Sequence, residues 1–230
     1  MARLGHRKPR NVGSKAEQAS SMSECDASMA GEHPGLPQFP GRDPQAMLEA
    51  ILGSMPAGDL WVFGYGSLLW NPEIAHSEVL PARVWGHKRC LCMWSRINRG
   101  TEHEPGLVFA LMGGGSCQGI VLRVPRSQAE HELRLLWKRE MPRAVYEPRW
   151  LRCHTPHGVV QALAFTLPRT SPSYTGSLDE AQLLHILRHR RGRFGTTLEY
   201  VVRTAHALRQ AGIRDRAVER VVALAKRHGL

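Results

Sequence analysis

Residues 62–70, which read Val-Phe-Gly-Tyr-Gly-Ser-Leu-Leu-Trp, constrain the fold more than any other stretch of the chain. The apolar run at 60–63 predicts a buried strand that stops at 64–67. Two glycines beside one tyrosine let a ligand approach the main chain, and successive N–H groups at such a turn can hold a carboxylate. The segment is therefore either an ordinary Gly-rich turn or the floor of a pocket. It does not match a GxGxxG phosphate loop, because Leu69 stands at the third glycine position.

Composition divides the chain into a polar extension and an apolar body. Residues 1–57 are rich in Ser, Pro, Gly and Ala, which predicts a disordered N-terminal extension in which 45–52 could form one short helix. We expect one domain over 58–230. No run of 18 apolar residues predicts a membrane span, and the basic N-terminus lacks the apolar stretch of a secretory signal. The five scattered cysteines indicate a reducing compartment, so we expect a cytoplasmic protein, with organelle targeting as the weaker alternative.

Strand patterns come first in the body and helical patterns gather late. Strands are predicted at 60–63, 83–94, 107–112, 119–124, 150–154 and 159–167, with a hairpin loop at 113–116. Helices are predicted at 127–139, 177–191, 196–211 and 215–228. This order favours an α+β fold, with a curved sheet or small β-barrel flanked by helices, over a doubly wound sheet.

Glu140 is the candidate catalytic carboxylate. It closes an amphipathic run at 133–137 and follows Lys138 and Arg139. The helix macrodipole disfavours an acid at a helix C-terminus, so a solvated Glu gains nothing there. If Glu140 is partly buried, its pKa rises and it can transfer a proton near neutral pH. If it is solvated, it is an ordinary surface residue, and the residues alone leave both interpretations open.

The net charge of +11 falls entirely on residues 58–230, because 1–57 hold equal numbers of acidic and basic side chains. A basic body suits an anionic ligand or a nucleic acid. The basic residues of 188–230 have helical spacing, which favours a solvated helix face. A non-enzymatic protein that binds nucleic acid or a partner through these helices remains the alternative of another class.

Eight segments, in the same order, resemble the ChaC-like family of γ-glutamylcyclotransferases, which act on glutathione. They lie at 62–70, 89, 99–108, 119–123, 136–141, 144–151, 174–176 and 192–200. The first is similar to the family's YGSL loop, and 136–141 is similar to the segment that bears its catalytic glutamate. Thr197 and Leu91 depart from the family pattern, since many members have Asn and Phe there.

The resemblance implies the cyclotransferase fold and cleavage of glutathione to 5-oxoproline and cysteinylglycine, without a metal or another cofactor. Glu140 would be the general acid and base. The expected substrate-binding residues are Tyr65, Gly66, Ser67, Leu68, Arg89 and Tyr174. We expect a small-molecule substrate and neither nucleic acid nor membrane as partner, and the sequence leaves the oligomeric state open. Cyclisation of other γ-glutamyl amines or peptides is the alternative within the family.

Overall fold

The frame of the fold is an antiparallel pair of long strands, β2 (Glu78–Ser95) and β3 (Gly106–Val124). The computed structural model describes residues 39–230. The pair is aligned from Glu78↔Arg123 to Ser95↔Gly106. Strands of this length bend and twist enough to be shared between the two sides of a barrel.

The sequence prediction of a hairpin loop at 113–116 is wrong, because β3 runs through these residues without a turn. Gly114 and Gly115 adopt positive φ values of 96° and 81°, and the facing Gly86 adopts 78°. The register shifts at this point and the antiparallel pairing then resumes. The glycines therefore form a bulge that bends the hairpin instead of ending it.

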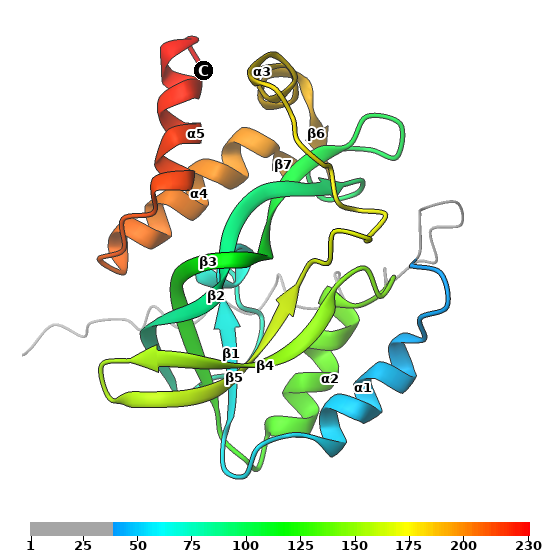
Figure 1. Cartoon of the computed structure of the whole chain (residues 1–230), viewed down its shortest axis with the longest axis vertical. Helices are drawn as coiled ribbons and strands as arrows, with labels where there is room; N and C mark the ends of the chain where they lie inside the picture. The colour runs from blue at the N-terminus through cyan, green and yellow to red at the C-terminus, as the bar shows by residue number, and fades with distance from the viewer. Residues whose placement is uncertain (1–38) are drawn as a thin grey trace, which may run out of the picture. The chain divides into compact units, whose positions relative to one another are not determined.

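Five strands close into a mixed barrel in the order β1-β3-β2-β4-β5 (Figure 1). Its other strands are β1 (Leu60–Gly64), β4 (Glu147–Thr155) and β5 (Gly158–Thr166). Parallel pairing of β1 with β5 closes the ring, whereas the pairs β1–β3, β2–β4 and β4–β5 are antiparallel. This architecture confirms the predicted α+β fold with a small barrel.

Helices cover the barrel in two groups (Figure 1). The first comprises α1 (Pro44–Gly53) and α2 (Ala129–Glu140). The second comprises α3 (Glu180–His189), α4 (Thr197–Gln210) and α5 (Arg216–Arg227), preceded by the short strands β6 (Arg191–Gly192) and β7 (Gly195–Thr196). The four helices predicted after residue 58 are all present. No described helix combines the length and the apolar character that crossing a bilayer requires.

Strand β1 is buried on both faces, which explains its uninterrupted apolar run. Val62 belongs to a core cluster that includes Leu133 and Leu136 of α2. Phe63 belongs to a second cluster, with Val84 and Cys117, contributed by the barrel strands. The β1 strand therefore leads the chain from the centre of the core directly into 64–67.

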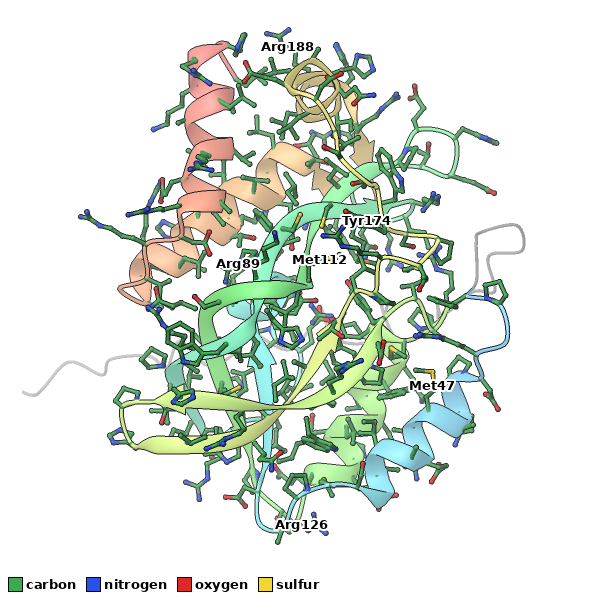
Figure 2. All side chains as sticks on the ribbon, viewed as in Figure 1. Met47, Arg89, Met112, Arg126, Tyr174 and Arg188 are labelled. Carbon is green, nitrogen blue, oxygen red and sulfur yellow. The ribbon has the colours of Figure 1, made fainter. Side chains whose placement is uncertain are left out.

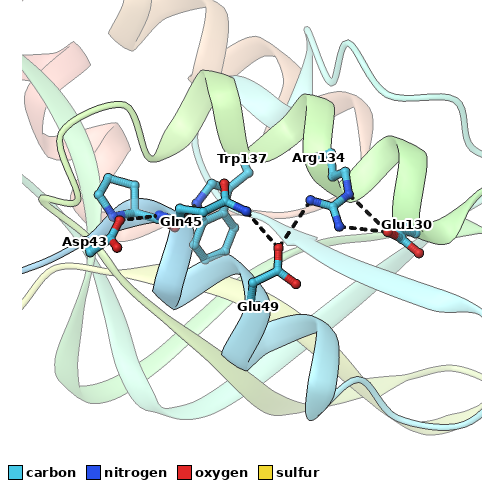
Figure 3. A network of polar contacts seen from close by, with 7 residues as sticks. Asp43, Gln45, Glu49, Glu130, Arg134 and Trp137 are labelled. Carbon is cyan, nitrogen blue, oxygen red and sulfur yellow. Dashed lines mark hydrogen bonds and ion pairs between the residues drawn. The ribbon is translucent and has the colours of Figure 1, made fainter.

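The short helix predicted at 45–52 is present as α1, and it packs on α2. Leu48 and Ile51 are buried, and Trp137 Nε1 of α2 donates a hydrogen bond to the carbonyl of Pro44 over 2.8 Å. On the exposed side, Glu49 accepts from Gln45 over 2.8 Å and pairs with Arg134 at 3.4 Å (Figure 3). Helix α1 lies within the 1–57 extension, whose boundary stays a prediction. The part of that extension before residue 39 lies outside the described residues.

The packing of α1 predicts that Leu48→Ala destabilises the fold. The substitution removes a side chain that is only 4% exposed and leaves a cavity, so we expect a loss of about 2–5 kcal/mol in the free energy of unfolding. Glu49→Ala is the matched control: its side chain is 54% exposed and the surface pairing should change stability little. Denaturant unfolding of both variants measures the difference, and equal losses would contradict the docking of α1.

Candidate functional site

The loop that follows β1 is built around two close approaches to the main chain. Gly66 precedes a single 3₁₀ turn, η1 (Ser67–Leu69). A Cβ atom on Gly66 would lie 2.7 Å from the hydroxyl of Tyr200, and one on Gly119 would lie 2.3 Å from the carbonyl oxygen of Gly64. Real Cβ atoms essentially never come this close to a neighbour, so a side chain at Gly66 would have to displace Tyr200 and one at Gly119 would have to displace the main chain at Gly64.

The main-chain N–H groups of Gly66, Ser67 and Leu68 donate to no acceptor among residues 39–230. These groups precede or begin a 3₁₀ turn, where no intrahelical partner exists. The side chain of Leu68 is buried in the core, so this residue can offer a ligand only its backbone. The loop therefore presents consecutive unused donors, which is the arrangement that binds a carboxylate or an oxyanion.

Arg89 of β2 lies behind this loop, with only 4% of its surface exposed. Its Nε donates to the carbonyl of Tyr65 over 2.7 Å, and Nη2 donates to the carbonyl of Gln118 over 2.6 Å. Its Nη1 pairs with Asp215, whose carboxylate also caps the N-terminus of α5. The described bonds of this guanidinium thus join the loop, β3 and α5. Contact between Arg89 and a substrate stays a prediction.

Glu140, the last residue of α2, has a side chain that is 16% exposed. Burial raises the pKa of this carboxyl above its usual value. The neighbouring charge of Arg139 opposes that rise in pKa, whereas Glu73 adds to it. The sequence left open whether this acid is buried or solvated, and the structure shows a largely buried carboxylate beside an arginine.

Arg139 connects Glu140 to the loop after β1. Its Nε lies 3.1 Å from Oε1 of Glu140, and its Nη2 donates to Oγ of Ser67 over 3.0 Å. Its Nη1 contacts the carbonyl oxygens of Asn71 and Pro72 at 2.7 and 3.1 Å and a carboxylate oxygen of Glu73 at 3.1 Å. The carboxylate of Glu140 and the loop with the unused N–H groups therefore contact the same guanidinium.

Sequence reasoning named Arg139 only as a basic neighbour of Glu140. Adjacent residues on a helix do not normally face each other, so spacing gave no reason to pair them. The two side chains meet because they lie at the last turn of α2, where the chain leaves the helix at Met141. The sequence signal that could have paired them is an arginine directly before a glutamate at a helix C-terminus. A guanidinium there can bind the carboxylate and also the last carbonyl groups of the helix.

The charge of the Glu140 carboxylate acts on three buried tyrosines, Tyr65, Tyr146 and Tyr200. Burial raises the pKa values of Tyr65 and Tyr146 well above normal and that of Tyr200 to about 12. The charge of Glu140 raises all three pKa values further, so the phenols are uncharged donors near neutral pH. The hydroxyl of Tyr65 donates to the carbonyl of Phe165 over 2.7 Å, and that of Tyr200 accepts from the N–H of Phe109 over 3.2 Å.

Tyr174 lies on the segment between β5 and α3, beside the end of β2 (Figure 2). It forms an antiparallel bridge with Met93, and the next residue, Thr175, donates to the carbonyl of Cys92 over 3.0 Å. Its side chain packs partly buried against the core cluster that contains Tyr146. Its contact with a substrate also stays a prediction.

Two other features of the described chain stand apart from this site. Hollows of about 610 and 380 Å³ lie beside Ile213, one at the start of α5 and one on the outside of the barrel next to Trp85. Neither is lined by Glu140 or by the loop after β1. Within 39–230, no three His, Cys, Asp or Glu side chains converge as metal ligands would.

Residues 60–228 match the family model described as ChaC-like protein. The chain belongs to the ChaC-like family. It is 34% identical over 172 residues to the glutathione-specific gamma-glutamylcyclotransferase of Escherichia coli (strain K12), covering 74% of each chain. It is 27% identical over 213 residues to glutathione-specific gamma-glutamylcyclotransferase 1 of Rattus norvegicus, covering 90% of each.

A solved structure shows that the ChaC-like chain shares its fold with a yeast protein. That protein is described as a gamma-glutamyl cyclotransferase specific to glutathione. The TM-score is 0.68 at 18% sequence identity, and the match covers 74% of this chain and 97% of the yeast chain. The barrel and the C-terminal helices therefore belong to a known architecture.

The contact at Gly66 predicts that Gly66→Ala destabilises the ChaC-like fold. The new methyl group would displace the hydroxyl of Tyr200, and we expect a loss of about 1–3 kcal/mol in the free energy of unfolding. Tyr200→Phe removes the obstructing oxygen, so the double variant should lose less than the sum of the two single losses. Gly53→Ala, which meets nothing within 4 Å, is the control in denaturant unfolding. Strict additivity would contradict the clash.

The contacts of Arg139 predict that Arg139→Gln raises the pKa of Glu140 further. The substitution removes the positive charge that lowers this pKa and leaves burial and Glu73, which both raise it. Titration of the Glu140 carboxyl carbon by NMR measures the change. Arg134→Gln on the same helix should leave the titration in place, because that arginine pairs with Glu130 and Glu49. An unchanged titration in Arg139→Gln would refute the coupling.

Proposed function

We propose that this protein cleaves glutathione to 5-oxoproline and cysteinylglycine, with Glu140 as the general base and acid. The observation that carries the proposal is the largely buried Glu140, which Arg139 holds against the loop at Ser67. Family membership supports the choice of substrate, since relatives from bacteria and mammals bear the name glutathione-specific gamma-glutamylcyclotransferase.

In this reaction the substrate supplies its own nucleophile. Glu140 takes a proton from the α-ammonium group of the γ-glutamyl residue, because only the neutral amine can attack. The amine nitrogen then bonds to the γ-carbonyl carbon and closes a five-membered ring. Glu140 returns the proton to the cysteine nitrogen as the bond from that carbon to this nitrogen breaks, which releases the amine of cysteinylglycine. The ring nitrogen then gives its second proton, through Glu140, to that amine, so the lactam is neutral and cysteinylglycine leaves as an ammonium. A carboxyl whose pKa is raised by burial is better matched to these transfers near neutral pH than a solvated one.

The loop after β1 supplies the second part of the proposed mechanism. Arg89 holds the carbonyl of Tyr65, and in a trans peptide the N–H of Gly66 points the opposite way, away from Arg89. We expect this N–H and those of Ser67 and Leu68 to bind the α-carboxylate of the γ-glutamyl group or the developing oxyanion. A substrate held in a curled pose would gain the proximity that ring closure needs. Tyr174 and the side chain of Tyr65 remain proposed contacts.

A reducing compartment belongs to the same proposal. The described cysteines are free thiols, which suits the cytoplasm that the sequence analysis favours. Glutathione is itself a thiol, and its reduced form is the proposed substrate.

The proposal predicts that Glu140→Gln folds normally and loses turnover by a factor of about 10² or more, since the amide can neither accept nor return the proton. The measurement is mass-spectrometric detection of 5-oxoproline after incubation with reduced glutathione. Glu130→Gln, an exposed change on the same helix, should retain activity. Near-normal release of 5-oxoproline by Glu140→Gln would refute the role of Glu140. Faster release from γ-glutamyl-alanine than from glutathione would favour the wider substrate class.

A further inference from the structure

Two arginines that the proposed mechanism does not use, Arg96 and Arg143, lie within electrostatic range of each other. Arg96 follows β2, and Arg143 follows α2. In each guanidinium the Nη1 atom is buried and has no hydrogen-bond partner among residues 39–230. Burial lowers the pKa of both groups, and the charge of Arg96 lowers that of Arg143 further. Burial therefore disfavours the charged forms of both side chains, and the charge of Arg96 also disfavours that of Arg143.

A third unused donor lies at 171–173, a segment that is hydrogen-bonded near both arginines. The carbonyl of Ser173 accepts from the N–H of Trp94 over 2.8 Å, two residues before Arg96. The hydroxyl of Ser171 donates to the carbonyl of Val145 over 3.0 Å, two residues after Arg143. Ser173 is completely buried, and its Oγ has no partner among the described residues. Hydrogen bonds thus bring the three unused groups to one region.

A protein group that would neutralise this region is absent from the described part of the chain. No acidic side chain of residues 39–230 forms an ion pair with Arg96 or Arg143. Glu102 acts on Arg96 through its charge alone, and raises its pKa. Native structures rarely leave buried donors such as these two Nη1 atoms and the Oγ of Ser173 unpaired. Forked guanidinium donors match the two oxygens of a carboxylate. The region is therefore complementary to a carboxylate that comes from outside the described chain.

The region is within reach of the proposed reaction centre. Arg143 is three residues from Glu140, so their Cα atoms are separated by at most about 11 Å. Tyr146 acts electrostatically on both residues, since the charge of Glu140 raises its pKa and its own charge raises that of Arg143. In glutathione the terminal carboxylate is two residues beyond the scissile bond, which spans about 7 Å. The separation of Glu140 from Arg143 therefore allows one glutathione molecule to reach both residues.

We propose that Arg96 and Arg143, with the hydroxyl of Ser173, bind the terminal glycine carboxylate of the peptide substrate. This inference rests on the proposed function and adds a specificity determinant to it. The unused N–H groups at 66–68 are left for the γ-glutamyl end of the substrate, where they would bind the α-carboxylate or the developing oxyanion. A γ-glutamyl amine without a terminal carboxylate would leave the arginine pair unpaired, so the site selects γ-glutamyl peptides that end in a free carboxylate.

The test compares kcat/KM for glutathione and for its glycinamide analogue, in which the terminal carboxylate is replaced by an uncharged amide. We expect the unaltered protein to prefer glutathione by about tenfold or more, as the loss of a charged hydrogen-bonded partner implies. In the double variant Arg96→Gln, Arg143→Gln, kcat/KM for glutathione should fall by a similar factor while that for the amide stays the same. The preference should then disappear. Arg152→Gln, an exposed arginine of β4, controls for the change in net charge.

The outcomes separate this inference from the proposed function. Turnover of both substrates at equal rates by the unaltered protein would overturn the carboxylate site and leave the cyclisation intact. So would an equal loss on both substrates in the double variant. If the unaltered protein released 5-oxoproline from neither substrate, the proposed function and the inference would both be overturned. If the double variant does not fold, Arg96→Lys and Arg143→Lys keep the charge without the fork and should weaken the preference only in part. Unchanged preference in both would overturn the site.

Discussion

The guanidinium of Arg139 is the group on which the geometry of the site depends. It contacts the carboxylate of Glu140 on one side and the chain from Ser67 to Glu73 on the other. Burial favours the protonated form of Glu140, and Arg139 favours the ionised form. A carboxyl with a raised pKa favours the folded state at low pH, and this contribution is lost as the pH rises through the raised pKa. The fold therefore gives up some stability near neutral pH to keep this acid buried.

A second arginine, Arg89, holds the same loop through a hydrogen bond at Tyr65. Arg89 holds the carbonyl of Tyr65 and reaches Asp215 at the start of α5, and Tyr200 of α4 fills the space beside Gly66. The C-terminal helices thus support the loop from behind, through a buried ion pair and a buried phenol. These contacts give the C-terminal helices a structural role in the site.

Local patterns predicted the helices, the barrel strands and the candidacy of Glu140, because periodicity and a carboxylate at a helix end are both visible in a short window. What escaped prediction depends on contacts between distant segments. The segment 113–116, with three glycines and a serine, resembles a turn in isolation, and only its pairing with β2 around Gly86 makes it continuous with β3. Arg139 needed the loop at Ser67, and Arg96 needed Arg143. Thr197, which departs from the family pattern, is buried and accepts from the N–H of Leu107 over 2.9 Å.

The charged groups of the proposed site complement the charged groups of the proposed substrate. Glutathione carries its α-ammonium and α-carboxylate on one carbon at the γ-glutamyl end and a second carboxylate at the glycine end. In the proposed complex, the loop at 66–68 faces the first carboxylate, Glu140 faces the ammonium, and Arg96 and Arg143 face the terminal carboxylate. Cyclisation converts the ammonium into an uncharged lactam nitrogen and separates the two carboxylates into different products. Each product then contacts only part of the site. Each product is therefore bound less tightly than the intact substrate, and cyclisation itself favours product release.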